Sequence, residues 1–146
     1  MRILFAFALL ASTALAHATD WDLPPASMPL EGCDASADAG LAACADKALE
    51  KADADLNAVW KKVLVTFDPK SAAGNSGDVT PAQLAEWKAD LVAAQQAWVT
   101  FKDKDCNGAR GYEYWGGSGR GIAVTSCLYE YTVNRAADLR TRYLDD

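Results

Sequence analysis

The sequence predicts an all-α fold, an antiparallel three-helix bundle stapled by two disulfides. Apolar residues recur every three or four positions along three separate segments. No segment alternates apolar and polar residues over the length of a β-strand, and four cysteines fall close to the ends of the helical segments. A chain of 146 residues with this pattern suits one domain with a modest core.

The first sixteen residues have the pattern of a secretory signal peptide. Arg2 supplies the positive charge, residues 3–10 form the apolar segment, and Ala14-Leu15-Ala16 is a small-x-small cleavage site. A cut after Ala18 fits the same rule. The apolar segment is shorter than the roughly 20 residues that span a bilayer, and no cysteine follows either site to carry a lipid. We therefore expect a single mature helical domain, residues 17–146, that is periplasmic or secreted and has no membrane anchor.

The charge balance is acidic. The chain has 14 basic and 20 acidic residues, and removal of Arg2 with the signal peptide leaves 13 against 20, a net charge of −7. Such a surface disfavours nucleic acid and anionic membranes as partners. It favours encounter with a cationic protein through long-range attraction.

The cysteines are Cys33, Cys44, Cys106 and Cys127. An even number in an exported chain predicts two disulfides, and the lack of a CxxC pair argues against zinc ribbons and redox motifs. Pairing Cys33 with Cys44 and Cys106 with Cys127 closes two short loops and is preferred. Pairing Cys44 with Cys106 and Cys33 with Cys127 stays open.

The helices follow in order. Residues 19–35 form an extended leader because Pro24, Pro25 and Pro29 oppose a helix. The first helix is expected over residues 38–67 and ends before Pro69. Its inward positions are Leu41, Ala45, Ala48, Ala52, Leu56, Val59, Val63 and Phe67.

A Gly/Asn/Ser loop, residues 71–79, leads to the second helix. This helix has the clearest start, with Thr80 as N-cap, Pro81 at the first position and Gln83 completing a capping box. Its inward positions are Leu84, Trp87, Leu91, Ala94, Trp98 and Phe101. The third helix is expected over residues 122–143, with Val124, Leu128, Tyr131 and Leu139 inward. This order of helices places all four cysteines at one end of the bundle.

A few polar residues are expected inside the bundle. Arg135 lies in the inward stripe of the third helix, and a buried guanidinium needs a carboxylate or several carbonyl groups. Its candidate partners are Asp53, Asp55, Asn57 and Gln95. Asn57 and Gln95 are expected to satisfy one another in the same core, so all three form a structural polar group.

The chain resembles the LprI family of lysozyme-inhibitor-like proteins, which are small exported helical proteins. The similar features are Asp53-x-x-Leu56-Asn57-x-x-Trp60, Leu91-x-x-x-Gln95-x-x-Trp98 running into Cys106, Gly116-Gly117-Ser118, and Cys127-x-x-x-Tyr131-Thr132-x-x-Arg135-x-x-x-Leu139. Position 102 departs from the family because Lys stands there in place of the usual Arg, which removes a bidentate contact. The resemblance implies a binding protein that inhibits lysozyme-type muramidases by steric blocking.

A loop over residues 108–121 is the expected partner-binding segment. It places five aromatic and arginine side chains among six glycines, and these residue types concentrate binding energy at protein interfaces. The residues are Arg110, Tyr112, Tyr114, Trp115 and Arg120. The expected partner is a cationic protein such as lysozyme. The other reading is a connector whose rings fold back onto the bundle.

Catalysis and metal binding have little support. The one histidine, His17, lies at the cleavage site, which removes histidine-based mechanisms. Residues 103–108 match the start of an EF-hand loop, but the twelfth position is Tyr114 where the motif needs Glu. We expect no enzyme activity, no cofactor and no metal. The alternative function is a periplasmic interaction or stress module that binds Ca²⁺ or a cell-wall fragment, and an uncharacterised hydrolase comes third.

Overall fold

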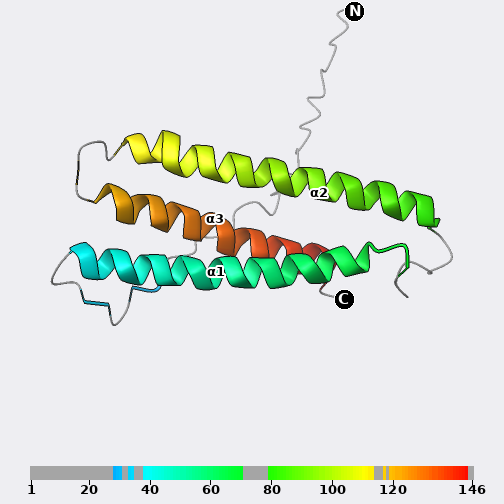
Figure 1. The fold of residues 1–146 in the computed structure, drawn as a ribbon, viewed down its shortest axis with the longest axis horizontal. Helices are drawn as coiled ribbons and strands as arrows, with labels where there is room; N and C mark the ends of the chain where they lie inside the picture. Colours follow the sequence, from blue (N-terminus) through cyan, green and yellow to red (C-terminus); the bar gives the residue numbers. More distant parts are fainter. Residues whose placement is uncertain are drawn as a thin grey trace, which may run out of the picture.

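The computed structural model describes residues 28–30, 33–34, 38–70, 79–113, 117 and 119–144. Its elements are three α-helices, α1 (Asp38–Thr66), α2 (Pro81–Asp103) and α3 (Arg120–Tyr143), and a π-helix, η2 (Lys104–Arg110), that continues α2. The described residues contain no strand. Figure 1 shows α2 running in the opposite direction to α1 and α3. The predicted all-α three-helix fold is confirmed. The expected signal peptide, residues 1–16, and most of the 71–79 loop lie outside the described residues.

α1 and α3 form the closest helix pair of the bundle. Small side chains, Ala45 and Ala52 on α1 and Ala136 on α3, are buried and let the two backbones approach each other. Larger apolar side chains then fill the core toward the other end of the pair. The core consists of Leu56, Val59, Val63, Leu91, Ala136 and Leu139, with Trp60, Phe67, Trp98, Tyr143 and Leu144 packed against it. The predicted inward stripe of α1 agrees with its buried residues.

α2 begins where the sequence predicts. The backbone N–H of Gln83 donates to the Thr80 hydroxyl at 3.3 Å, and the backbone N–H of Thr80 donates to the Gln83 side-chain oxygen at 2.9 Å. Pro81 occupies the first turn, where no backbone donor is needed. The capping box is therefore confirmed, and it fixes the point at which the chain enters the second helix.

The predicted inward stripe of α2 is only partly buried, which corrects the sequence analysis. Leu84 and Leu91 are buried, but Trp87 is 47% exposed, Phe101 is 53% exposed and Ala94 is exposed. The stripe covers a wider arc than two neighbouring helices can bury, so one edge of it faces solvent. α2 therefore depends on fewer apolar contacts than α1 and α3.

Polar contacts join α2 to both neighbouring helices. The ammonium group of Lys102 on α2 donates to the hydroxyl of Thr132 on α3 at 3.0 Å and lies 3.6 Å from the carboxylate of Asp53 on α1. The same ammonium is 5.1 Å from the Trp98 ring centroid. Thr132 is fully buried and donates in turn to Asp53 at 3.3 Å. Lys102 thus connects all three helices through one charged group.

We predict that Thr132→Val lowers the free energy of unfolding by about 1–3 kcal/mol, because a mostly buried ammonium loses a hydrogen-bond acceptor. Urea denaturation measures this change. Thr125→Val is the matched control, because the Thr125 hydroxyl bonds Asp46 at the exposed surface. The control should change stability by less than about 0.5 kcal/mol. Equal effects of the two variants would contradict the role assigned to the Lys102 contacts.

The two disulfides lie at the same end of the bundle. Cys33 pairs with Cys44 and Cys106 pairs with Cys127, the preferred arrangement of the two left open by the sequence. Figure 1 shows the start of α1, the end of α2 and the start of α3 at this end. Gly40 lets the leader approach α1, because a Cβ there would lie 2.5 Å from the carbonyl oxygen of Asp34.

Candidate functional site

The end of α2 widens into a π-helix before the chain turns toward α3. The π-helix η2 covers Lys104–Arg110 and closes with a bond from the backbone N–H of Gly111 to the carbonyl of Cys106, five residues earlier. Cys106 is fully buried and Cys127 is 6% exposed, so their disulfide fixes this element against α3 from inside. The sequence predicts an irregular segment here from residue 108 onward. The structure corrects this expectation, because the helical path continues through Tyr112.

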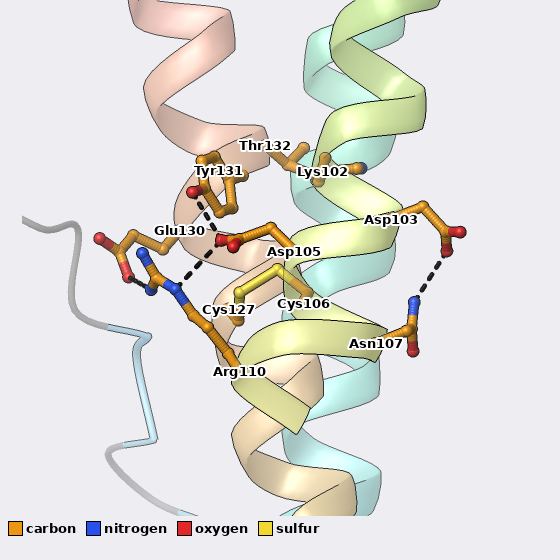
Figure 2. The surroundings of a disulfide bond; sticks show 10 residues. All are labelled: Lys102, Asp103, Asp105, Cys106, Asn107, Arg110, Cys127, Glu130, Tyr131 and Thr132. Atoms are coloured by element: carbon orange, nitrogen blue, oxygen red, sulfur yellow. Dashed lines mark hydrogen bonds and ion pairs between the residues drawn. A yellow bond between two sulfur atoms is a disulfide. The ribbon is translucent and has the colours of Figure 1, made fainter. Parts of the chain in front are cut away.

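The π-helix brings Asp105 and Arg110 together. In an α-helix, residues five apart point about 140° apart, whereas the wider π turn brings them closer to the same side. The Arg110 guanidinium lies 3.1 Å from Asp105 and 3.8 Å from Glu130, and it is 5.4 Å from the Tyr131 ring centroid. The Tyr131 hydroxyl donates to Asp105 at 2.8 Å. Figure 2 shows these side chains converging on one side of the disulfide.

Tyr131 should ionise at an unusually high pH. Burial raises the pKa of its hydroxyl above the ordinary value of 10, and the bond to the Asp105 carboxylate raises it further. A raised folded-state pKa means that the stabilisation is complete below pH 10 and is lost as the pH rises through the folded pKa.

We predict that the Tyr131 hydroxyl ionises above pH 10. The tyrosinate absorbance that Tyr131→Phe removes from the titration curve should therefore appear only above that pH. Spectrophotometric titration of both proteins measures this difference. A Tyr131 contribution that appears at or below pH 10 would contradict the structure.

Arg120, at the start of α3, bonds back to the π-helix. Its Nε donates to the carbonyl of Gly111 at 3.2 Å and its Nη2 donates to the carbonyl of Asn107 at 3.1 Å. Gly111 is buried beneath it. A Cβ at that position would lie 3.0 Å from the Cys106 carbonyl oxygen and 3.2 Å from both Arg120 and Val124. The disulfide, Arg120 and Gly111 together hold the two stems of the intervening loop at a fixed separation.

The five residues predicted to bind a partner divide into three groups. Arg110 and Arg120 contact their own chain as described above. Tyr112 is 72% exposed. Tyr114 and Trp115 lie outside the described residues. The sequence did not indicate the arginine contacts, because α-helical spacing followed by a loop does not describe a segment that is partly π-helical.

The predicted polar core is found in part. Arg135 Nε donates to the Gln95 side-chain oxygen at 2.9 Å, and its Nη1 bonds Asp138 at 2.8 Å. Asp138 lies one turn further along the same helix and is not among the partners expected for Arg135 from the sequence. The expected place of Asn57 is corrected, because this residue is exposed on α1. Helical spacing alone could not separate Asn57, at the edge of the buried arc, from the core.

The EF-hand-like segment does not gather its carboxylates. Asp103 accepts a hydrogen bond from the Asn107 side chain at 2.8 Å, whereas Asp105 contacts Tyr131 and Arg110. Figure 2 shows the two aspartates on opposite sides of the helix. Within the described part of the chain, no three Asp, Glu, His or Cys side chains come together as metal ligands would. No observation in this segment therefore favours the Ca²⁺ alternative.

The residues that build this end of the bundle fall within a known family. The model of the family described as lysozyme inhibitor LprI matches residues 33–139. This chain belongs to the LprI family. A relative from Rhizobium meliloti (strain 1021) has the name of an uncharacterized protein. It is 35% identical to this chain over 97 residues, which cover 66% of this chain and 67% of the relative. No solved structure matches the chain.

Membership in the LprI family supports a binding role over an enzymatic one, because the family description is that of an inhibitor. The family match runs from the first cysteine to Leu139 and so includes both disulfides, the π-helix and the Arg120 contacts. None of the helices in the described ranges has the length and apolar character needed to cross a membrane.

Proposed function

We propose that this LprI-family protein is a periplasmic inhibitor of lysozyme-type muramidases that acts by steric blocking of the substrate cleft. The observation that carries the proposal is the match of the lysozyme-inhibitor family model over residues 33–139. The same proposal includes cleavage of residues 1–16 as a signal peptide, with residues 17–146 as the mature domain. The proposed mode of action needs a protruding, well-anchored binding element.

The disulfide-bonded end of α2 and α3 supports such an element. Cys106–Cys127 and the two bonds from Arg120 hold the stems of the loop between η2 and α3. Fixed stems leave the segment between them fewer conformations to lose on binding than free ends would, so more of its contact energy appears as affinity. Tyr112, which is highly exposed at the first stem, provides an aromatic contact of the kind found at binding hot spots.

The two arginines support the loop in this account. The Arg110 guanidinium already has Asp105 and Glu130 as counter-charges, and Arg120 bonds two backbone carbonyls. Contact with a carboxylate of the target would have to compete with these bonds. We therefore assign the direct contacts to Tyr112, Tyr114 and Trp115 and assign Arg110 and Arg120 to holding the loop.

The acidic surface provides a direct test of the partner class. A mature net charge of −7 attracts a strongly basic enzyme, and added salt screens this attraction. We predict one-to-one binding to a basic lysozyme, with a dissociation constant that rises as sodium chloride is added. Isothermal titration calorimetry measures both quantities on the oxidised protein. A basic ribonuclease of similar size is the control. Equal affinity for the ribonuclease would mean that the protein binds lysozyme only by unspecific charge attraction, which would contradict the proposal.

A further inference from the structure

One edge of α2 carries a row of exposed apolar residues. Trp87, Ala94 and Phe101 are spaced by seven residues, about two helical turns, and therefore lie on the same side of the helix. Trp87 is 47% exposed, Phe101 is 53% exposed and Ala94 is exposed. We call these three residues the α2 edge. The two half-exposed aromatic rings stand on either side of the small residue Ala94, on one face of the helix.

The α2 edge combines an exposed aromatic ring with an apolar groove. A shallow groove of about 350 Å³ lies at the Trp87 end and is lined by Phe67, Trp87, Asp90, Leu91, Ala94 and Tyr143. Phe101 lies toward the other end, 53% exposed, and its ring is perpendicular to that of Tyr131 at a centroid distance of 5.6 Å. The helix therefore presents an exposed aromatic ring and a groove along the same edge.

We propose that two copies of this protein associate through α2, antiparallel to one another, about a two-fold axis at Ala94. Trp87 and Phe101 lie about 10.5 Å on either side of Ala94 along the helix. A two-fold axis there places Phe101 of each copy against Trp87 and the groove of the other. The interface is isologous, because the same surface serves both copies. The small side chain of Ala94 allows the two helices to approach closely at the axis.

The charges beside the α2 edge match the same arrangement. Glu86 and Lys104 are eighteen residues apart, which is five helical turns, and helical dihedral angles continue through Lys104. Both residues are exposed. Antiparallel pairing about Ala94 brings Glu86 of each copy within an axial offset of about 3 Å of Lys104 of the other. The meeting of opposite charges favours the antiparallel arrangement.

The exposed area sets the strength of the association. A buried aromatic side chain covers about 150–250 Å², and Trp87 and Phe101 each leave about half of that exposed. Four such rings in a dimer contribute roughly 400 Å², well below the about 1,200 Å² of stable complexes. The expected product is a reversible dimer whose population rises with concentration.

Ala94→Arg tests the axis directly. Sedimentation equilibrium of the oxidised protein, from micromolar to submillimolar concentration, should show a monomer–dimer equilibrium. Arg at position 94 should lower the association constant by about tenfold or more, because two like charges meet at the axis. Ala89→Arg is the matched control, since Ala89 is also exposed on α2 but faces away from Ala94. The control should associate like the wild type, and both variants should keep the helical circular dichroism of the wild type.

A charge exchange tests the antiparallel direction. Glu86→Lys and Lys104→Glu should each weaken the dimer, and the double variant should restore it, because each copy then presents the reversed pair. A monomer at every concentration would overturn the proposal. So would equal weakening by Ala94→Arg and Ala89→Arg, or a double variant no tighter than the single ones. If the wild type is a monomer and Ala94→Arg no longer binds lysozyme, the α2 edge contacts lysozyme and not a second copy.

Discussion

Replacing Cys106 and Cys127 together with serine is expected to lower the free energy of unfolding by about 3 kcal/mol or more. The chain-entropy model gives about 3 kcal/mol for a loop of this length. The structure adds a further cost, because Cys106 is fully buried and its bond to Cys127 holds η2 against α3. We therefore expect a fall in melting temperature on the order of 10 °C, measured by circular dichroism on wild type and variant.

The disulfide between Cys33 and Cys44 provides the comparison. It closes a loop of similar entropic size, but both cysteines are partly exposed and Cys33 lies in the leader. Its replacement by serine should cost about 3 kcal/mol or less. It should also leave the tyrosinate titration of Tyr131 unchanged, because that residue lies beside the other disulfide. A larger loss at Cys33–Cys44 than at Cys106–Cys127 would contradict the central place given to η2.

Replacing Tyr112, Tyr114 and Trp115 together with alanine is expected to weaken binding to lysozyme by about tenfold to a thousandfold. Truncation of aromatic anchors at an interface costs about 2–4 kcal/mol at a hot spot. The loss of the Tyr112 ring should change the free energy of unfolding little, because this side chain is 72% exposed. Calorimetric titration into lysozyme gives the affinity, and thermal unfolding checks the fold.

Val65→Ala is the control for the aromatic loop. It removes a side chain that is 63% exposed near the end of α1, and Figure 1 shows that end of α1 opposite the end of α2 from which the loop starts. Its affinity for lysozyme should equal that of the wild type. An unchanged affinity of the loop variant in a folded protein would contradict the assignment of the loop to partner contact.

Much of the fold follows from local sequence signals. The capping box at Thr80 and Gln83 fixes the start of α2, and the regular alanine and aliphatic spacing of α1 predicts its buried face. The short separations within the cysteine pairs indicate the preferred pairing, and the structure has that pairing. These signals are reliable because each depends on residues that are close in the sequence.

Other features depend on how the helices pack. The stripe of α2 includes Trp87 and Phe101, but only packing decides which edge of a wide apolar arc is buried. The residues of the 104–110 segment do not indicate a π-helix, so the contact between Asp105 and Arg110 could not be predicted from α-helical periodicity. The carbonyl acceptors of Arg120 depend on the same backbone path.

The measurement that tests the account most directly is a titration of the oxidised protein into a lysozyme while cell-wall lysis is followed. The account predicts loss of lysis that is complete near one equivalent and becomes weaker as salt is added. The aromatic-loop variant should need a large excess for the same effect. Undiminished lysis at micromolar protein, across several lysozymes, would contradict the proposed inhibition.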